Sequence, residues 1–373
     1  MNFGFTEEQE FLRNTAREFL EKECPMSVVR ELMETESGYR PELWRKMAEL
    51  GWVGLLLPEE YGGAELGFVD LVVILEEMGR SLLPSPFFGN LQGTLALLRS
   101  GSDAQKKEIL PAVAAGDRIL TFAITEETGT EHAQDIQLRA EKAGAGLRLT
   151  GTKLFVPDGQ NAGTFVVAAR TGAEGESGIS LVLVDRDAPG LSVTPLRSMD
   201  QTRRMAEVRF EGTPGELLGK QDAGWATWEA VRDAALVALS ADAVGGCEKV
   251  LEDSVNYAKE RIQFGKPIGT YQAIKHKCAD MLIEVESSKS ITYYAAWALS
   301  EDVEEAALAA AMAKAYTSDA YRHTSAENIQ IHGGVGFTWE YDCHLYFKRA
   351  KAVEVTYGSP SEHRERVAQL MSL

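Results

Sequence analysis

The chain has 373 residues, 45% of them hydrophobic and 25% charged, so it can bury a large core and is expected to hold two or three subdomains. Its formal net charge of −18 argues against nucleic acid as a partner, because phosphate binding needs clustered lysine and arginine. None of its four cysteines has C-x-x-C spacing, so neither a metal site nor a disulfide framework is expected.

Neither a membrane span nor a secretory signal is expected. The first residues, Met1–Glu8, lack the basic region and the apolar core of a signal peptide. No apolar run approaches ~18 residues, the length that a membrane-spanning helix needs. The sequence therefore predicts a cytoplasmic protein without a membrane partner.

Residues 1–118 are predicted to form an N-terminal helical domain. Thr6 and Gln9 have the spacing of a capping box ahead of the first apolar helical run. Pro41 suits the first turn of the next helix. Later helices are expected at 69–78 and 104–116.

Residues 119–222 are predicted to form a small β-barrel or sandwich. Short runs of β-branched and apolar residues, separated by Gly, Asp and Pro, are typical of such domains. The runs cover 119–125, 137–143, 147–156, 164–169, 179–184, 191–196 and 205–210. Gly144-Ala-Gly146 is expected to connect a hairpin. Because no helix follows this glycine pair, a dinucleotide-binding Rossmann fold is not supported.

Residues 223–373 are predicted to form a C-terminal helical bundle. Apolar residues three or four apart mark one helical face, namely Trp225, Trp228, Val231, Ala235 and Leu239. Further helical runs are expected at 245–260, 269–299, 303–329 and about 339–348. The predicted fold class is therefore α+β and mainly α, with a helical domain on each side of the β domain along the chain.

Two segments of this last domain carry residues suited to a ligand. Arg261 and Phe264 lie in a loop between two long helices, where Arg261 could clamp a phosphate and Phe264 could stack on a planar ring. Gly333 and Gly334 follow a helix, and glycine permits both a positive φ and a close approach of another group to the backbone. On local grounds alone, ordinary turns explain both segments equally well.

The chain resembles the acyl-CoA dehydrogenase family over essentially its full length. The order of helices, strands and helices matches, and so do several separate motifs. These are Pro58-Glu-Glu-Tyr-Gly-Gly63, Ala123-Ile-Thr-Glu126, Gly151-Thr-Lys-Leu-Phe155, Arg261-x-x-Phe264-Gly with Gln272-Ala, and Gln330-Ile-x-Gly-Gly-x-Gly-Phe337. Their joint presence at the family's intervals is far more specific than any single motif.

This resemblance implies an FAD-containing enzyme that desaturates an acyl-CoA thioester, in fatty acid or steroid side-chain β-oxidation. In the family, a carboxylate removes a proton from Cα, the flavin takes hydride from Cβ, and an acceptor like electron-transfer flavoprotein takes the electrons. The base must lie within hydrogen-bond reach, and the thioester oxygen must be stabilised as charge develops. The resemblance also implies a dimer of dimers, homomeric or heteromeric, with FAD across a dimer interface.

The same resemblance implies the site residues, position by position. Thr125 and the strand containing Phe155 and Val156 would flank the flavin ring of their own subunit. Another set would hold the pyrophosphate and adenine of a partner subunit's FAD, namely Arg261, Phe264, Gln272, Gln330, Gly333 and Gly334.

The catalytic base departs from the family pattern. The family's Glu lies in a Tyr-Glu-Gly-Thr loop, whereas this loop reads Thr356-Tyr357-Gly358-Ser359. A tyrosine with an ordinary pKa of ~10 is almost fully protonated at neutral pH, so Tyr357 could act as a base only with a shifted pKa. Some branches place the Glu on an earlier helix, where Ala235 stands here. Asp233, and beyond it Glu229, are the nearest carboxylates that could substitute.

Other positions that face the chain's own substrate also differ from the family. Leu236 stands where an Arg often contacts CoA, and Glu131 stands where a Ser often does. Pro157 replaces a Thr beside the flavin and has no N–H or hydroxyl to donate. The partner-directed positions are retained, which favours a subunit that completes a partner's active site. Asp200-Gln-Thr-Arg-Arg204 resembles heteromeric bacterial enzymes of steroid side-chain breakdown, although strand-edge solubility would also explain both arginines.

Three functions remain open at this point. The first is an acyl-CoA dehydrogenase subunit whose catalytic Glu comes from a related partner chain. The second is a self-sufficient homomeric acyl-CoA dehydrogenase with an unusual base. The third is a non-catalytic scaffold that binds acyl-CoA or flavin. No motif specifies the acyl chain of the substrate.

Overall fold

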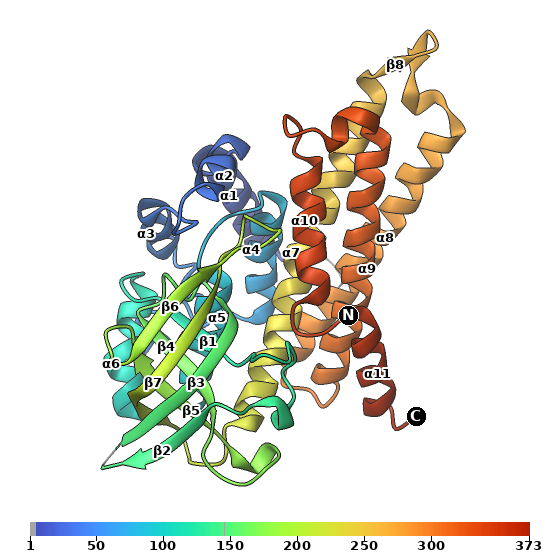
Figure 1. Cartoon of the computed structure of the whole chain (residues 1–373). Coiled ribbons are helices and arrows are strands. Elements are labelled where there is room, and N and C mark those ends of the chain that lie inside the picture. Colours follow the sequence, from blue (N-terminus) through green and yellow to red (C-terminus); the bar gives the residue numbers. More distant parts are fainter. Residues whose placement is uncertain (1–4, 145) are drawn as a thin grey trace. The chain divides into compact units, whose positions relative to one another are not determined.

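The structure, a computed structural model, describes residues 5–144 and 146–373 (Figure 1). The chain forms two compact units, each assembled from separate segments. The helical unit comprises the residues up to Glu31, Phe68–Leu83 and Leu236–Leu373. The sheet unit comprises Leu32–Gly67 and Pro84–Ala235.

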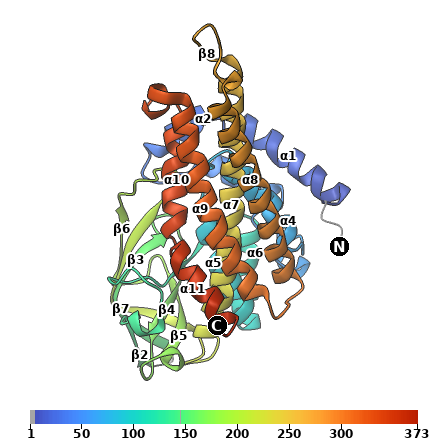
Figure 2. The same ribbon diagram turned by 90° about the vertical axis from the view of Figure 1, so that its right-hand side faces the viewer.

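Long helices build the helical unit. They are α1 (Glu7–Glu23), α4 (Phe68–Arg80), α8 (Gln272–Ser300), α9 (Ala306–His332), α10 (Cys343–Val355), α11 (Pro360–Leu370), and parts of α2 (Met26–Met33) and α7 (Trp225–Glu260). In Figure 2, α7 to α10 run alongside one another, and α9 packs against α8, α10 and α11. Alanine supplies much of the buried face of α9, and its small side chain lets neighbouring helices approach closely. A short hairpin of β8 (Ile262–Gln263) and β9 (Lys266–Pro267) projects beyond the ends of α7 and α8 (Figures 1 and 2).

The start of α1 confirms the predicted capping box. The Thr6 side chain accepts a hydrogen bond from the Gln9 backbone N–H at 3.2 Å, and Gln9 Oε1 accepts one from the Thr6 N–H at 3.1 Å. Two backbone donors that have no partner inside the helix are satisfied in this way.

Helix α7 differs from the prediction, which placed separate runs at 225–239 and 245–260. One continuous helix of 36 residues covers both. Gly245 and Gly246 do not end the helix, because tertiary packing outweighs the low helix propensity of glycine. A Cβ on Gly245 would lie 1.9 Å from the Glu76 carbonyl oxygen, so glycine is what allows α7 to touch the backbone of α4. Nearby, Arg349 Nη1 donates to Asp242 Oδ1 at 2.8 Å, and this buried ion pair ties α10 to α7.

The sheet unit holds a mixed sheet of seven strands. They are β1 (Leu120–Ala123), β2 (Arg139–Ala143), β3 (Gly146–Pro157), β4 (Thr164–Arg170), β5 (Ile179–Asp185), β6 (Leu191–Leu196) and β7 (Met205–Leu218). β4 pairs with β2, β2 with β3, β3 with β7, β7 with β5, and β5 again with β4, so these pairings close a circuit. β1 adds in parallel to β4, and β6 adds antiparallel to β7. The closed circuit agrees with the predicted small barrel.

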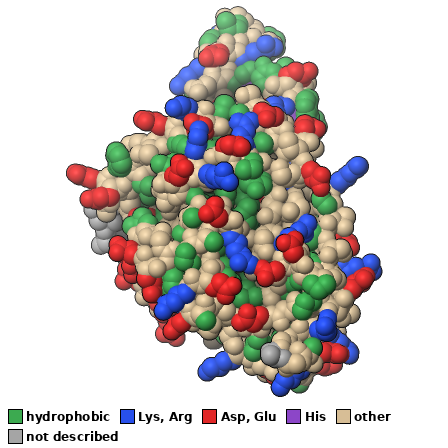
Figure 3. All heavy atoms as spheres, turned by 90° about the vertical axis from the view of Figure 1, so that its left-hand side faces the viewer, with side chains coloured by type: hydrophobic (Ala, Val, Ile, Leu, Met, Phe, Trp, Pro, Cys, Tyr) green, Lys and Arg blue, Asp and Glu red, His purple; other side chains and the backbone are tan. Residues whose placement is uncertain are grey.

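Alternation along these strands builds the core of the sheet unit. Inward residues such as Leu149, Phe165, Val182 and Phe210 are at most 1% exposed. The helices α3 (Pro41–Glu49), α5 (Phe87–Ser100) and α6 (Asp103–Ala114) belong to the same unit, and α5 packs against β1. On the face drawn in Figure 3, acidic and basic side chains are interspersed, so the excess of carboxylates forms no single-sign patch there.

The predicted fold class is confirmed: helices precede and follow a central mixed sheet. The domain boundaries at 118 and 222 stay a prediction. Elements absent from the prediction are α2, α5, α11 and the β8–β9 hairpin. The expected connection at Gly144–Gly146 lies where β2 and β3 pair as Ala143 with Gly146, and residue 145 is outside the described residues. No helix in the described part of the chain is long and apolar enough to cross a membrane.

Candidate functional site

A buried ion pair shapes the loop that follows β1 in the sheet unit. Lys153 on β3 is fully buried, and its Nζ donates to Glu126 Oε1 at 2.7 Å and to the Ile124 carbonyl at 2.8 Å. The Glu126 carboxylate also accepts the backbone N–H groups of Gln137 and Leu138, at 2.9 and 3.0 Å. Burial lowers the pKa of Lys153 to about 8, although the Glu126 carboxylate opposes this shift. The pair thus joins both ends of the 124–138 loop to the sheet.

Thr125 lies on this loop and its hydroxyl is engaged. Thr125 Oγ1 donates to Glu131 Oε1 at 2.8 Å, and the Thr125 carbonyl accepts the Leu154 N–H at 2.9 Å. The second contact places Thr125 beside the strand that contains Phe155 and Val156. The resemblance puts Glu131 where a Ser often contacts CoA, and in the structure its carboxylate accepts the Thr125 hydroxyl.

Phe155 departs from regular strand geometry. Its backbone has a φ of 51°, and its side chain is 53% exposed, whereas the neighbouring Val156 is buried. A left-handed φ at an aromatic residue is strained, and such strain often marks a functional site. The Pro157 carbonyl accepts the Thr121 hydroxyl at 2.5 Å, but Pro157 donates nothing. The segment can therefore offer an aromatic surface to a planar ligand but no donor at position 157.

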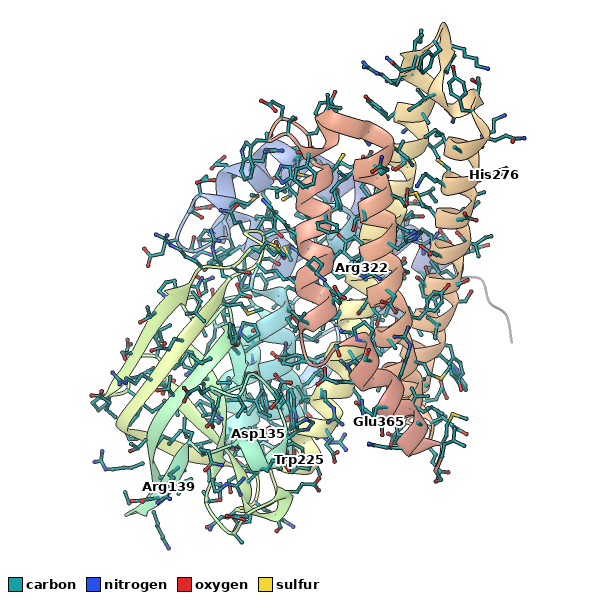
Figure 4. All side chains as sticks on the ribbon, turned by 45° about the vertical axis from the view of Figure 1, so that its right-hand side comes forward. Asp135, Arg139, Trp225, His276, Arg322 and Glu365 are labelled. Carbon is teal, nitrogen blue, oxygen red and sulfur yellow. The ribbon has the colours of Figure 1, made fainter. Side chains whose placement is uncertain are left out.

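The predicted phosphate-binding loop is the β8–β9 hairpin of the helical unit. Its turn holds Phe264 at a φ of 53°, with the ring 92% exposed. The Arg261 backbone N–H donates to the Tyr257 carbonyl at 2.8 Å, and the Arg261 carbonyl accepts a hydrogen bond from the Ile268 N–H, also at 2.8 Å. The Arg261 guanidinium has no hydrogen-bond or ion-pair partner within the described residues, and it is exposed. Gln272 begins α8 at the base of the hairpin and is also exposed; Figure 4 labels the nearby His276 on the same helix.

The end of α9 forms the second predicted segment. Gly333 follows the helix with a φ of 66°, as expected for a helix end. Gln330, Gly333 and Gly334 are exposed, and a Cβ built on either glycine would meet nothing within 4 Å. The space beside both glycines is therefore open to another molecule.

One aromatic contact brings these two segments together. The rings of Tyr257, near the end of α7, and His332, the last residue of α9, stack with centroids 4.1 Å apart. Arg261 comes directly after α7 and Gly333 directly after α9. The residues predicted to reach a partner's FAD therefore share one end of the helical unit.

The loop with Tyr357 is held by several backbone contacts. Tyr357 has a φ of 55° and is 8% exposed. His363 Nε2 bonds to the Tyr357 carbonyl at 2.9 Å, and the fully buried Lys314 donates to the carbonyls of Gly358 at 3.0 Å and Glu354 at 3.3 Å. A lysine at the C-terminal end of α10 also favours the helix dipole. The loop that carries the base in the family is therefore rigidly built here around a tyrosine.

The alternative base positions lie on α7, in the part that belongs to the sheet unit. Ala235 is fully buried and has no group that can accept a proton. Asp233 is 8% exposed, and its Oδ1 lies 3.6 Å from Arg232 Nε. Asp233 is thus a buried carboxylate beside Arg232. Glu229 is partly exposed and lies 3.6 Å from the same arginine.

Strand-edge solubility does not describe Arg203 and Arg204. Arg204 is partly buried, and it donates to the carbonyls of Met33 at 2.7 Å, Leu32 at 3.3 Å and Gln201 at 3.1 Å. The Arg203 guanidinium lies 5.0 Å from the centroid of the Phe88 ring. Both arginines therefore stabilise the packing of the sheet unit.

Several residues of this site escaped sequence reasoning, and all are polar groups that hold its loops. They include Lys153, Lys314, His363 and Tyr257. Lys314 lies in an alanine-rich helical run, where a lysine is normally expected to be exposed to solvent, yet it is fully buried. The only signal available for Lys153 was its place in the Gly151–Phe155 motif.

Known proteins resemble this chain over its full length. Residues 6–117, 121–213 and 222–372 match the N-terminal, middle and C-terminal domains of acyl-CoA dehydrogenase. The acyl-CoA dehydrogenase IpdE2 of Mycolicibacterium smegmatis is 32% identical over 363 residues, which cover 97% of this chain and 98% of that protein. A variant of the Tcur3481-Tcur3483 steroid ACAD superposes with a TM-score of 0.89 at 33% identity and 98% coverage of both chains. The ChsE4-ChsE5 complex from Mycobacterium tuberculosis contains a chain with a TM-score of 0.89 and 28% identity, covering 100% of this chain and 99% of that one.

Proposed function

Because the chain belongs to the acyl-CoA dehydrogenase family of FAD-dependent oxidoreductases, we propose that it is one subunit of a heteromeric acyl-CoA dehydrogenase. A related partner chain supplies the carboxylate that removes the Cα proton. This chain in turn supplies residues that hold the FAD of that partner. The single observation that carries the proposal is Tyr357 in the loop where the family places its Glu.

The proton-transfer step explains why this position matters. The Cα proton of a thioester is weakly acidic, so the base must be ionised and lie within hydrogen-bond reach of it. Tyr357 and Ala235 occupy the two positions that the family uses for a carboxylate. Neither residue is a carboxylate, so a carboxylate from another chain is the simplest source of the base.

The partner-directed residues fit FAD. Arg261 offers an exposed guanidinium without an ion-pair partner among the described residues, which suits a diphosphate. The open backbone at Gly333 and Gly334 allows close approach of a ligand. Phe264 exposes nearly its whole ring, which a neighbouring subunit and its cofactor would cover. When bound, FAD supplies the acceptor for the hydride that leaves Cβ.

The chain's own flavin-facing segment fits less well. Phe155 can pack against a flavin ring and Thr125 lies beside it, but Pro157 provides no hydrogen-bond donor. The Thr125 hydroxyl also donates its hydrogen bond to Glu131, so it has no proton left to donate to a flavin. We therefore assign Thr125, Phe155 and Val156 a packing role and leave proton transfer to the partner chain.

The names of the relatives support a heteromer. The ChsE4-ChsE5 complex contains two differently named chains, and the Tcur3481-Tcur3483 protein is a steroid ACAD with a paired name. By analogy, this chain would act on a CoA thioester of the fatty acid or steroid side-chain type. Its assembly would be a dimer of dimers in the cytoplasm, with an electron-transfer flavoprotein as the electron acceptor.

Co-expression with a related acyl-CoA dehydrogenase chain from the same genome tests the proposal. Alone, the purified chain should contain substoichiometric FAD and show little acyl-CoA dehydrogenase turnover. With its partner, both FAD content and turnover should recover, and replacing the partner's catalytic Glu with Gln should abolish turnover. Full turnover by the homomer on an acyl-CoA would refute the proposal.

A homomer with an unusual base is the second candidate, and the constrained Tyr357 loop is the observation that favours it. Three groups position this loop: Lys314, His363 and the left-handed backbone of Tyr357 itself. In this candidate, either Tyr357 or Asp233 removes the Cα proton, so Tyr357→Phe or Asp233→Asn should abolish turnover by the isolated chain. If neither change matters, neither residue is the base.

A further inference from the structure

A cavity of about 540 Å³ lies wholly within the helical unit. Residues of α1, α4, α7 and α10 line it, together with His332 at the end of α9. Its volume falls in the range of small-molecule sites and far exceeds what one ordered water needs. None of the residues predicted to contact FAD lines it, although its wall includes the Tyr257–His332 stack that adjoins the partner-directed segments.

Charge pairing leaves this cavity with an excess of carboxylates. Its lining cations are already engaged: Arg17 Nη2 lies 2.7 Å from Glu77, Lys249 Nζ lies 2.5 Å from Asp253, and Arg80 pairs with Glu252. Another lining acid, Asp342, pairs with Arg30 at 2.7 Å. Glu21 and Glu260 also line the cavity, at exposed positions. No hydrogen bond or ion pair within the described residues holds either carboxylate, although Glu21 adds to the negative field around Arg17. The cavity therefore offers two carboxylates that a cationic ligand could neutralise.

One wall of the cavity is aromatic. His332 stacks on Tyr257, and the ring of Tyr341 meets His332 edge-on at 5.9 Å. Aromatic faces attract cations, and the attraction grows when water is excluded. Aromatic and carboxylate groups around one cavity are the combination that recognises organic cations.

His332 adds an acceptor to this wall. The side chain is 9% exposed, and its Nδ1 bonds to the Asn328 carbonyl at 2.8 Å, so Nδ1 is the donor and carries the proton. Nε2 then has a lone pair, and it has no hydrogen-bond partner in the described part of the chain. Because His332 lines the cavity, Nε2 is available to accept a hydrogen bond from a ligand with an N–H donor.

We propose that this cavity binds a small organic cation that carries N–H donors, an alkylammonium or guanidinium compound. Glu21 and Glu260 neutralise its charge, the rings of Tyr257 and Tyr341 face its cationic group, and His332 Nε2 accepts one of its hydrogen bonds. A metal ion is a poorer fit, because the described residues contain no group of three His, Cys, Asp or Glu side chains placed to hold one. The site does not depend on how the enzyme obtains its catalytic base.

Titration calorimetry with agmatine tests this site on the purified protein, as a homomer or with its partner. Agmatine carries a guanidinium at one end and a primary ammonium at the other. We expect saturable binding with one site per chain, weakened at least about tenfold by Glu260→Gln and by His332→Phe. The phenylalanine keeps an aromatic ring against Tyr257, but it removes both the Nε2 acceptor and the Nδ1 donor to the Asn328 carbonyl. Butyrate, an anion of similar size, should not bind.

A matched control separates the cavity from the general negative charge of the protein. Glu365→Gln makes the same charge change on α11, at an exposed position outside the cavity (Figure 4). Agmatine affinity in this variant should equal that of the wild type. Absence of saturable binding at 10 mM agmatine, or the same affinity in all three variants, would overturn the proposal. Circular dichroism and unfolding temperature check that each variant is folded.

Discussion

Two regions of the helical unit differ in what they retain. The end of α9 and the β8–β9 hairpin keep the family's residues and present them to solvent, with Phe264 92% exposed and the Arg261 guanidinium accessible. The 355–359 loop carries Tyr357 where the family places its carboxylate; Tyr357 is buried, and Lys314 and His363 hold the backbone around it. The retained residues are accessible to another molecule, whereas the altered position is enclosed by its own chain. This contrast supports the proposal that the chain functions through its contact with a partner.

Removing the charge from the retained surface should have the largest effect. Arg261→Ala in the co-expressed assembly should lower turnover by about 1000-fold, because an enclosed arginine–phosphate contact is worth roughly 2–5 kcal/mol. FAD content should fall in parallel, as measured by flavin absorbance. Arg322→Ala provides a control on α9, where Arg322 pairs only with carboxylates of its own chain (Figure 4). Unchanged FAD binding in Arg261→Ala would remove the hairpin from the site.

The second-largest effect should come from breaking the buried Lys153–Glu126 ion pair of the sheet unit. Lys153→Ala leaves the Glu126 carboxylate buried without its cation, so the free energy of unfolding should drop by about 3 kcal/mol in urea titrations. Adding Glu126→Gln should recover part of this loss, since a neutral amide costs less to bury. Lys259→Ala, at an exposed position, should change stability little. Equal losses in the single and the double variant would contradict this account.

A buried carboxyl should make the stability of the helical unit depend on pH. Burial raises the pKa of Glu76 to about 8 against an ordinary 4.5, although Arg13, Tyr293 and Lys289 oppose the shift and Glu248 adds to it. Between these two pKa values, the folded chain holds a proton that the unfolded chain has released. The resulting contribution to the free energy of unfolding is complete below pH 4.5 and is lost as the pH rises through about 8.

The free energy of unfolding should accordingly fall by roughly 2 kcal/mol between pH 6 and pH 9. Glu76→Gln should remove this part of the decline, because glutamine does not titrate. Chemical unfolding at a series of pH values measures both. A wild-type profile that rises over this range, or an unchanged profile in the variant, would show that Glu76 is ionised in the folded chain.

The smallest effect is expected at Tyr357. Tyr357→Phe keeps the ring and removes the hydroxyl, so turnover of the co-expressed assembly should change less than about twofold. Asp233→Asn should behave in the same way. A loss of about 100-fold in either variant would make that residue the base and reverse the comparison. Steady-state kinetics on one acyl-CoA is sufficient.

Many secondary-structure elements of this chain could be predicted from its sequence, because they depend on residues close together along the chain. Strand runs such as 164–169 and 179–184 are apolar and β-branched, and they became β4 and β5 almost residue for residue. The Thr6 capping box and the positive φ of Gly333 follow from side-chain and backbone geometry alone. The family resemblance placed Arg261 and Gln330 in the exposed segments that the structure shows near each other.

Contacts between distant segments could not be predicted in this way. Helix α7 continues through Gly245 because that glycine meets the Glu76 carbonyl on α4, a contact with no local signature. Lys314 reads as a surface lysine until α10 and the 355–359 loop place carbonyls around it. The engagement of Thr125 by Glu131 likewise depends on how one loop folds back on itself.

Reduction of bound flavin by the isolated chain tests the central claim most directly. The purified chain, reconstituted with FAD, is mixed anaerobically with an acyl-CoA, and the flavin absorption is followed in a single turnover. The account predicts no bleaching by this chain alone and rapid bleaching once the related partner chain is added. Rapid bleaching by the isolated chain would show that it contains its own base.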